Sequence, residues 1–332
     1  MRLLLNLFWL GVVCAIVLGL GLGWFAMEVS EPASTMDEPV VYHVPPGATG
    51  RSVSTDLEEK NLIVNGLAFR LLLSYYEKRN GAALQAGYFQ VDPKKDIRGV
   101  LDELLYGEPL TRKATIPEGY VKAQVAASLE EQGVVSSNEF GAALESVDLG
   151  WEFPRNLEGY LFPSTYEFPY ECTGEAAVRQ MTEQFKSVVE PMLEKYPNKP
   201  LSLKETVILA SLVEREAQVA SERPLIAGVY INRINKGMKL ECDATVQFAL
   251  GKQKAVLLYS DLEIASPYNT YRYPGLPPGP ICSPGAASLE AAFNPKKSDY
   301  LFYVRNDVKN DGSHVFGRNF SEHQANISKY QR

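Results

Sequence analysis

A long apolar stretch without a charged residue limits what the rest of this chain can do. Residues 3–27 contain one polar amide, Asn6, and no Asp, Glu, Lys or Arg. A run of this length is sufficient to span a bilayer as a helix. Arg2 precedes it while Glu28 and Glu31 follow it, and this charge bias predicts a cytoplasmic N-terminus with the remainder outside. A cleaved signal peptide is the alternative, but the apolar core is too long and no small-x-small cleavage site follows.

The remaining length indicates two domains, or one domain and a small module. Residues 28–40 are short, acidic and proline-containing, which predicts a tether after the anchor of residues 1–27. About 290 residues follow, and the hydrophobic content of 45% is enough for real cores. We predict a mixed α+β fold, with a first module over residues 41–110 and a second domain over residues 111–332.

The module has a β-α-α-β pattern. Its expected strands are residues 41–44 and 86–91, and its expected helices are residues 51–60 and 66–78. A third helix over residues 96–106 is closed by Gly107. Residues 112–199 mix strand and helix. Near the C-terminus, residues 300–304 and 314–316 predict a hairpin joined by a polar connection.

Charge and motif content exclude several classes of function. The net charge of −7 is opposite in sign to that of a typical nucleic-acid-binding protein. The chain has no phosphate-binding loop and no dinucleotide fingerprint. Its three histidines, at positions 43, 314 and 323, do not form a metal-binding spacing, so we expect no metal and no cofactor. We assign structural roles to His314 and His323.

Glu214 occupies an unusual position at the end of an apolar helix. Ser202 followed by Glu205 predicts a capping box, and residues 206–213 carry no charge. One helical face collects Leu203, Val207, Ala210, Glu214 and Ala217. Desolvation on such a face favours the neutral, proton-donating form of a carboxyl group. The alternative is that the buried run ends at Val213 and Glu214 begins a solvated turn.

Residues 266–285 form a loop that is rich in proline and tyrosine. Proline restricts the backbone and removes donors, so this loop is expected to be stiff without being a helix or a central strand. Its Tyr268, Tyr271 and Tyr273 lie beside Asn269. Flat rings and amides on a stiff loop suit a polar ring such as a sugar, whereas the alternative is an ordered connector whose tyrosines pack on the protein body.

Taken together, these segments resemble the endolytic murein transglycosylases of the YceG-like family over essentially the whole chain from residue 41. The motifs that carry the resemblance are Leu157-Glu-Gly-Tyr-Leu-Phe-Pro163, Ser211-Leu-Val-Glu214-Arg-Glu, Ala220-Ser-Glu-Arg-Pro, Val229-Tyr-Ile-Asn-Arg233, Asp243-Ala-Thr-Val-Gln247, Pro267-Tyr-Asn-Thr-Tyr271 and Gly275-Leu-Pro-Pro-Gly-Pro-Ile281. The resemblance implies that Glu214 is the catalytic acid. It also implies a LysM-like, glycan-binding fold for residues 41–110, for which a purely structural platform is the alternative, and a catalytic domain for residues 111–332.

The chain departs from the family pattern at two places. Ser164 follows Leu-Phe-Pro where the family usually has an aspartate, so any charge-balancing role of that position is in doubt. Glu241 and Cys242 stand where small or amide side chains are more usual, although Asp243 and Thr245 still match.

The resemblance implies a bacterial enzyme of the inner membrane, with its catalytic part in the periplasm. It would cut the β-1,4 bond between N-acetylmuramic acid and N-acetylglucosamine inside glycan strands, leave 1,6-anhydro ends and terminate nascent strands beside cell-wall synthases.

The candidate substrate-binding residues are Asn269, Tyr271, Asp243, Glu158 and Thr245. Glu216 projects about 200° from Glu214 and is expected on another wall. Two alternatives stay open: a two-carboxylate muramidase with Glu158 or Asp243 as the partner acid, and a non-catalytic peptidoglycan-binding scaffold.

Three cysteines, Cys172, Cys242 and Cys282, lie on the side expected to be oxidising. An odd number leaves at least one thiol free. Cys242 and Cys282 each flank a site motif, so a bridge between them is one of the possible pairings.

Overall fold

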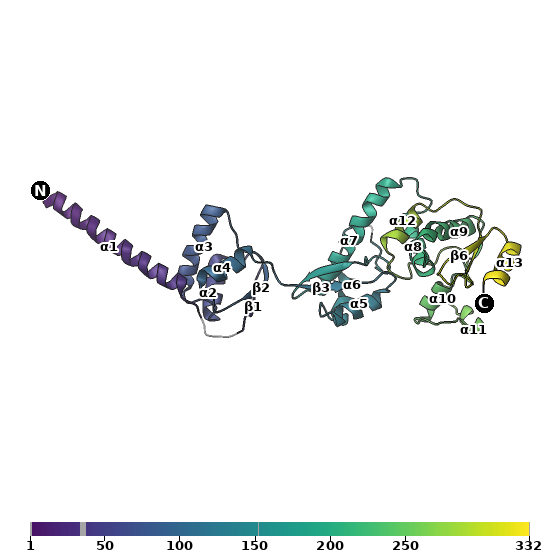
Figure 1. The fold of residues 1–332 in the computed structure, drawn as a ribbon, viewed down its shortest axis with the longest axis horizontal. Helices are drawn as coiled ribbons and strands as arrows, with labels where there is room; N and C mark the ends of the chain where they lie inside the picture. Colours follow the sequence, from purple (N-terminus) through teal and green to yellow (C-terminus); the bar gives the residue numbers. More distant parts are fainter. Residues whose placement is uncertain (1, 34–37, 152, 332) are drawn as a thin grey trace. The chain divides into compact units, whose positions relative to one another are not determined.

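Two structural units account for residues 2–33, 38–151 and 153–331, the part of the chain that the computed structural model describes. Unit 1 comprises Met1–Arg112 together with Pro169–Glu171, and unit 2 comprises Lys113–Phe168 together with Cys172–Arg332. Helices and short antiparallel strands occur in both units (Figure 1), so the expected mixed α+β class is confirmed.

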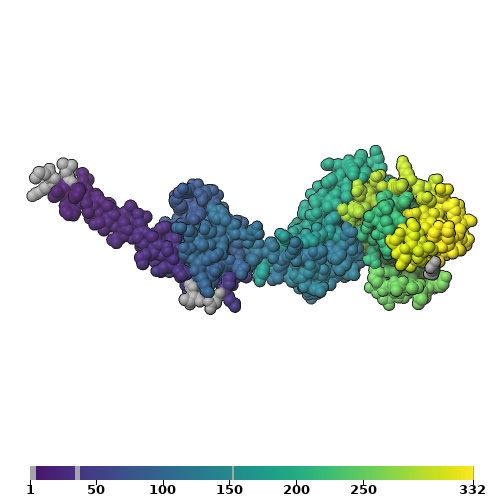
Figure 2. Space-filling model, in the orientation of Figure 1, coloured from purple at the N-terminus to yellow at the C-terminus, as the bar shows by residue number. Residues whose placement is uncertain are grey.

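Helix α1 (Arg2–Ser30) is long and apolar enough to cross a membrane, over the 26 residues Leu5–Ser30. Its large side chains are mostly exposed, as the bare purple helix in Figure 2 shows. Only its C-terminal end joins a core, because Val29 is buried and Phe25 is partly buried in unit 1. The helix therefore extends three residues into the predicted tether of residues 28–40, of which residues 34–37 lie outside the described part.

Unit 1 follows the β-α-α-β order that the sequence predicts, and each bound differs from the predicted one by at most two residues. Its elements are β1 (Val40–Val44), α2 (Gly50–Glu59), α3 (Gly66–Asn80), β2 (Gly87–Val91) and α4 (Ile97–Tyr106). Strands β1 and β2 pair antiparallel, with Tyr42 opposite Phe89. These two rings alternate with exposed neighbours and are buried against the helices, which explains why a two-stranded sheet persists here.

Unit 2 is built around helix α8. Its elements in chain order, counting β3 and β4 whose end residues fall in unit 1, are β3 (Thr111–Thr115), α5 (Lys122–Glu131), α6 (Ser137–Ser146), β4 (Thr165–Pro169), α7 (Gly174–Lys195), α8 (Leu203–Glu216), the 3-10 helix η1 (Ala220–Glu222), α9 (Arg223–Asn235), α10 (Asp243–Leu250), α11 (Tyr259–Leu262), α12 (Ala286–Phe293), β5 (Phe302–Arg305), β6 (His314–Gly317) and α13 (Phe320–Tyr330). Helix α8 contacts α9, α10 and α12 (Figure 1), and every residue from Thr206 to Val213 is buried. The apolar run is therefore the centre of the core.

Local hydrogen bonds and residue types account for the start of α8, the C-terminal hairpin and the irregular loop between them. Ser202 caps α8 by accepting the Glu205 N–H, and the Glu205 carboxylate accepts the Ser202 N–H, so the predicted capping box is confirmed. Strands β5 and β6 form the predicted C-terminal hairpin, with Tyr303 opposite Phe316. Residues 266–285 contain neither helix nor strand, as their proline content predicts.

Candidate active site

Glu214 lies in the last turn of α8 with its side chain only 8% exposed. The alternative of a solvated terminal turn is therefore wrong. One carboxylate oxygen, Oε2, accepts the Gly285 N–H at 3.0 Å, at the start of helix α12. The other, Oε1, lies 4.0 Å from the Arg223 guanidinium. A carboxylate held by a backbone donor at a helix N-terminus and by a nearby cation has a fixed position from which it can exchange a proton.

A second carboxylate, Glu118, lies beside the same glycine. A Cβ atom on Gly285 would come within 1.8 Å of Glu118 Oε1, so in this arrangement the Glu118 carboxylate lies directly against the glycine. Glu118 is otherwise exposed. Its pKa is raised, first by partial burial and then by the charge of Glu214, while Arg223 opposes the shift. The two carboxylates and the arginine therefore form one electrostatic group.

The sequence patterns did not single out Glu118 as a candidate site residue. The turn is fixed by long-range contacts: the Gly119 N–H donates to Ser283 O at 2.9 Å, and the Ser283 N–H donates to Tyr120 O at 2.8 Å. Arg215 adds a contact to Gly119 O at 3.4 Å. A carboxylate between proline and glycine in a tight turn was the only signal available, and it is a weak one.

Glu158 is brought to the same region but is almost completely buried, with 3% exposure. Its carboxylate accepts the Lys122 N–H, with distances of 3.1 and 3.4 Å to the two oxygens, at the start of helix α5. Burial raises its pKa to about 7, although the Lys122 N–H and charge oppose the rise. The next residue, Gly159, has φ +83° and touches Pro280 so closely that a Cβ would lie 2.4 Å from the proline Cβ. The motif around Glu158 is thereby locked to the proline-rich loop.

A cavity of about 340 Å³ opens between α5 and α10, with Glu158 in its wall. Glu214 is adjacent in sequence to Arg215, another wall residue, and both Glu158 and Glu214 act electrostatically on the thiol of Cys282. The cavity is lined by Val121, Lys122, Ala123, Gln124, Glu158, Arg215, Ala244, Gln247, Phe248, Gly251, Lys252, Gln253 and Ile281. The walls combine apolar surface with charged and amide side chains and one aromatic ring, Phe248, next to the candidate acid.

Two other candidates, Asp243 and Tyr271, lie in a different cavity of about 330 Å³. The Tyr271 hydroxyl donates to Asp243 Oδ1 at 2.5 Å. Glu216 lines this second cavity and accepts hydrogen bonds from the Cys242 thiol at 3.2 Å and the Tyr303 hydroxyl at 3.1 Å. The 200° between Glu214 and Glu216 thus separates them onto different walls, as predicted.

Asn269 and Thr245 are fully buried, so neither presents a polar group to solvent. The Asn269 amide donates to Leu262 O at 2.8 Å and Ile264 O at 3.0 Å, and its oxygen accepts the Tyr271 N–H at 3.0 Å. The Thr245 hydroxyl donates to Cys242 O at 2.7 Å. These side chains hold the proline-rich loop and the start of α10 in place, which is a different use from the sugar contacts expected of them.

We expect Asn269→Ala to lower the stability of unit 2 by about 1–3 kcal/mol, because it removes two hydrogen bonds to partly buried carbonyl groups, of which Ile264 O keeps the Ser266 N–H as a donor and Leu262 O loses its amide donor. Tyr271→Phe removes a single hydrogen bond at a partly exposed position and should cost less. Thermal melts of both variants measure the difference. An Asn269→Ala protein that melts like the wild type would show that these hydrogen bonds do not stabilise the loop.

The bridge considered between Cys242 and Cys282 is absent, and all four cysteines are free. The Cys242 thiol donates to Glu216, whereas the Cys282 thiol donates to Ser211 O. Glu216 and Ser211 lie at different positions along α8 and on different faces of it, so each thiol has its own hydrogen-bond acceptor.

Fold and site together define a mixed α+β protein with an N-terminal apolar helix and a fixed carboxylate suited to acid–base chemistry. The YceG-like family model matches residues 42–329, and the chain belongs to this family. This agrees with the resemblance inferred from the motifs.

Similarity to known proteins extends over most of the chain. It is 34% identical over 308 residues to an endolytic murein transglycosylase of Bacillus subtilis (strain 168), covering 87% of this chain and 84% of the relative. A Streptococcus pneumoniae (serotype 2, strain D39) protein of the same name is 31% identical over 328 residues, and the match covers 88% of this chain but 58% of that longer relative. A crystal structure of a YceG-like protein from Listeria monocytogenes matches with a TM-score of 0.57 and 30% identity, covering 87% of this chain and 99% of that one.

Proposed function

We propose that this chain is an endolytic peptidoglycan lytic transglycosylase. It would cut the β-1,4 bond between N-acetylmuramic acid and N-acetylglucosamine within a glycan strand and leave a 1,6-anhydro end. The observation that carries the proposal is the placement of Glu214, a carboxylate buried at the end of the core helix, and held by Gly285 and Arg223. A relative of similar length that is named an endolytic murein transglycosylase supports it.

One carboxyl group suffices for this reaction. Protonated Glu214 donates its proton to the glycosidic oxygen as the bond from that oxygen to the anomeric carbon breaks. The resulting carboxylate then accepts the proton of the muramic 6-hydroxyl, and that oxygen forms a new bond to the anomeric carbon. The ring closes as a 1,6-anhydro sugar, Glu214 is protonated again, and no water is consumed.

The other candidate site residues have different roles in this proposal, according to where they lie. Glu158, at the wall of the 340 Å³ cavity, is placed to shape the sugar site and to position the start of α5. Asp243 and Tyr271 line the cavity on the other side of α8, where they would bind a more distant part of the strand. Asn269 and Thr245 position the loop between these cavities.

Glu118 favours a second candidate, a two-carboxylate muramidase. Ordinary glycoside hydrolysis pairs an acid with a second carboxylate that acts on water or on the sugar. Glu118 is exposed and electrostatically coupled to Glu214, which fits that role better than buried Glu158 or than Asp243 in the other cavity. Hydrolysis would leave reducing muramic ends.

Product analysis separates the candidates. Purified glycan strands are incubated with the protein, and the new ends are identified by mass spectrometry. We expect anhydro ends, which are lighter than reducing ends by the mass of one water. Reducing ends would establish the muramidase, and the absence of new ends would establish a non-catalytic scaffold. Glu118→Gln is the informative variant: it should abolish hydrolysis but only modulate transglycosylation.

The proposed setting is the bacterial inner membrane. Helix α1 would act as a single-pass anchor with a cytoplasmic N-terminus, and the chain that follows it would lie in the periplasm. The β-α-α-β part of unit 1 would be a LysM-like module that binds glycan strands. Near the membrane the enzyme would terminate nascent strands in the company of cell-wall synthases.

A further inference from the structure

A third, larger cavity adjoins the one that contains Glu158. Its volume is about 740 Å³, within the usual range for a site that holds a small molecule or a short peptide. It lies between α5, α6 and the segment before Glu158, and it shares Lys122 and Ala123 with the 340 Å³ cavity. The two cavities are therefore neighbours at the first turn of α5, which carries both shared residues.

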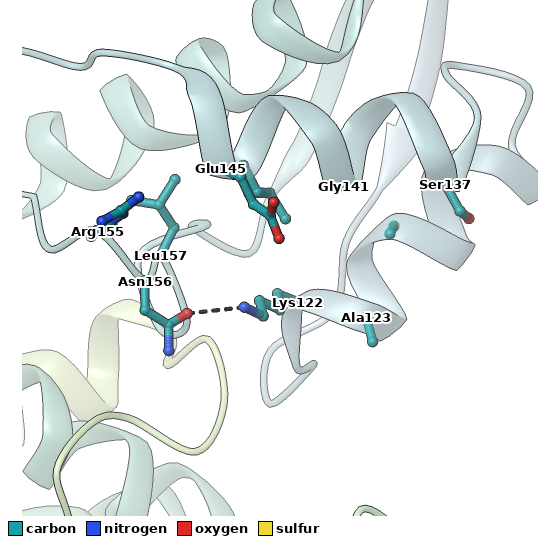
Figure 3. A pocket seen from close by; sticks show the side chains of 10 residues that line it. Lys122, Ala123, Ser137, Gly141, Glu145, Arg155, Asn156 and Leu157 are labelled. Atoms are coloured by element: carbon teal, nitrogen blue, oxygen red, sulfur yellow. Dashed lines mark hydrogen bonds between the residues drawn. The ribbon is translucent and has the colours of Figure 1, made fainter.

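Charged groups of both signs line this cavity. Lys122 and Arg155 supply positive charge, and Glu145 of α6 supplies one negative charge (Figure 3). The Lys122 ammonium donates to the neutral Asn156 amide oxygen at 3.1 Å. Within the described residues, neither Arg155 nor Glu145 has an ion-pair partner. Both charges are exposed and available to a ligand.

The uncharged walls distinguish this cavity from a sugar-stacking site. Ala126, Leu144 and Leu157 give it small apolar surfaces, and Gly141 leaves the face of α6 open. The described residues that line it include no aromatic ring on which a pyranose could stack. Small apolar walls with separated positive and negative charges instead match a short peptide that carries methyl groups, carboxylates and an amine.

We propose that this cavity binds the peptide arm that muramic acid residues carry in peptidoglycan, so that the enzyme selects strands whose arms are intact. The proposal rests on the proposed function, because the adjoining site must hold the sugar that bears the arm. Arg155 and Lys122 would bind carboxylates of the arm, and Glu145 would bind the amine of its diamino acid. The alanine methyl groups would lie against Ala126, Leu144 and Leu157.

The test compares two substrates that differ only in the peptide arm. Glycan strands are divided into two portions, and an amidase removes the arms from one of them. We expect the full-length protein in detergent to cut the intact strands with the higher kcat/KM. Arg155→Glu should lower the ratio of the two efficiencies roughly tenfold, since it reverses a charge that faces a carboxylate. Arg179→Glu, a charge reversal at an exposed site on α7, is the matched control and should leave the ratio unchanged.

Each remaining outcome is decisive. Equal efficiencies on both strands for the wild type, or a ratio that Arg155→Glu does not change, would overturn the proposal while leaving transglycosylase activity in place. If the wild type cuts neither strand, the proposed function fails, and the cavity is tested by calorimetry with the tripeptide L-alanyl-γ-D-glutamyl-L-lysine. Millimolar or tighter binding that Arg155→Glu weakens would still support a peptide site, whereas no binding would exclude it.

Discussion

Glu214→Gln is expected to lower the rate of glycan cleavage by about 10²–10⁴, the usual contribution of a positioned acid–base group. The amide can still accept the Gly285 N–H through its oxygen, so the end of α8 should keep its position. Stability should therefore change little. The measurement is the initial rate of new chain ends from purified strands, together with a thermal melt of the same preparation.

A matched control separates chemistry from charge. Glu183→Gln makes the same substitution at an exposed position of α7 and should retain wild-type activity. Glu216 is less suitable, because its buried carboxylate accepts hydrogen bonds from Cys242 and Tyr303. If Glu214→Gln retained activity within about tenfold of the wild type, far above the loss expected for an acid–base group, the assignment of the catalytic acid would be wrong.

Glu158→Gln is expected to remove a pH dependence of stability. In the folded protein burial raises the Glu158 pKa to about 7 from its ordinary value of 4.5, so the folded state prefers the protonated form. Its stabilising contribution is complete below pH 4.5 and is lost as the pH rises toward 7. The free energy of unfolding should decline by about 3 kcal/mol over this window because of this one group. The uncharged glutamine cannot titrate and should flatten that part of the profile.

Urea unfolding at pH 5 and pH 8 measures this effect. A soluble form lacking residues 1–24 is suitable, because it keeps Phe25 and Val29, which pack on the core of unit 1. The quantity of interest is the difference between wild type and variant, since Glu118 and Glu216 also have raised pKa values and contribute slopes of the same sign. Parallel profiles for the two proteins would show that Glu158 is not buried as a neutral acid.

Features set by neighbours in the sequence were predictable. The capping box at Ser202 and the uncharged run after it fixed the start of α8, and the angle of 100° per residue then placed Glu214 and Glu216 on different walls. Strand alternation and turn residues similarly predicted the elements of unit 1 and the C-terminal hairpin. The catalytic role of Glu214 came from family resemblance, which periodicity alone does not supply.

Features decided by packing between distant segments were not predictable. Glu118 reaches Glu214 only because the turn at residues 116–119 docks on the proline-rich loop, where Gly285 leaves room for it. Asn269 belongs to a family motif, yet its amide turns inward to satisfy carbonyl groups of its own loop.

The sequence by itself therefore determined the apolar helix at the N-terminus, the order of the elements in unit 1, the C-terminal hairpin and the face of α8 that carries Glu214. Hydrogen bonds and side-chain spacing within a helix or hairpin depend on nearby residues, so a sequence pattern records them directly. Only the tertiary structure decided which carboxylates meet, which polar side chains are buried and where the cavities lie. These depend on how irregular loops pack against the core, and loops have no periodicity from which side-chain direction can be inferred.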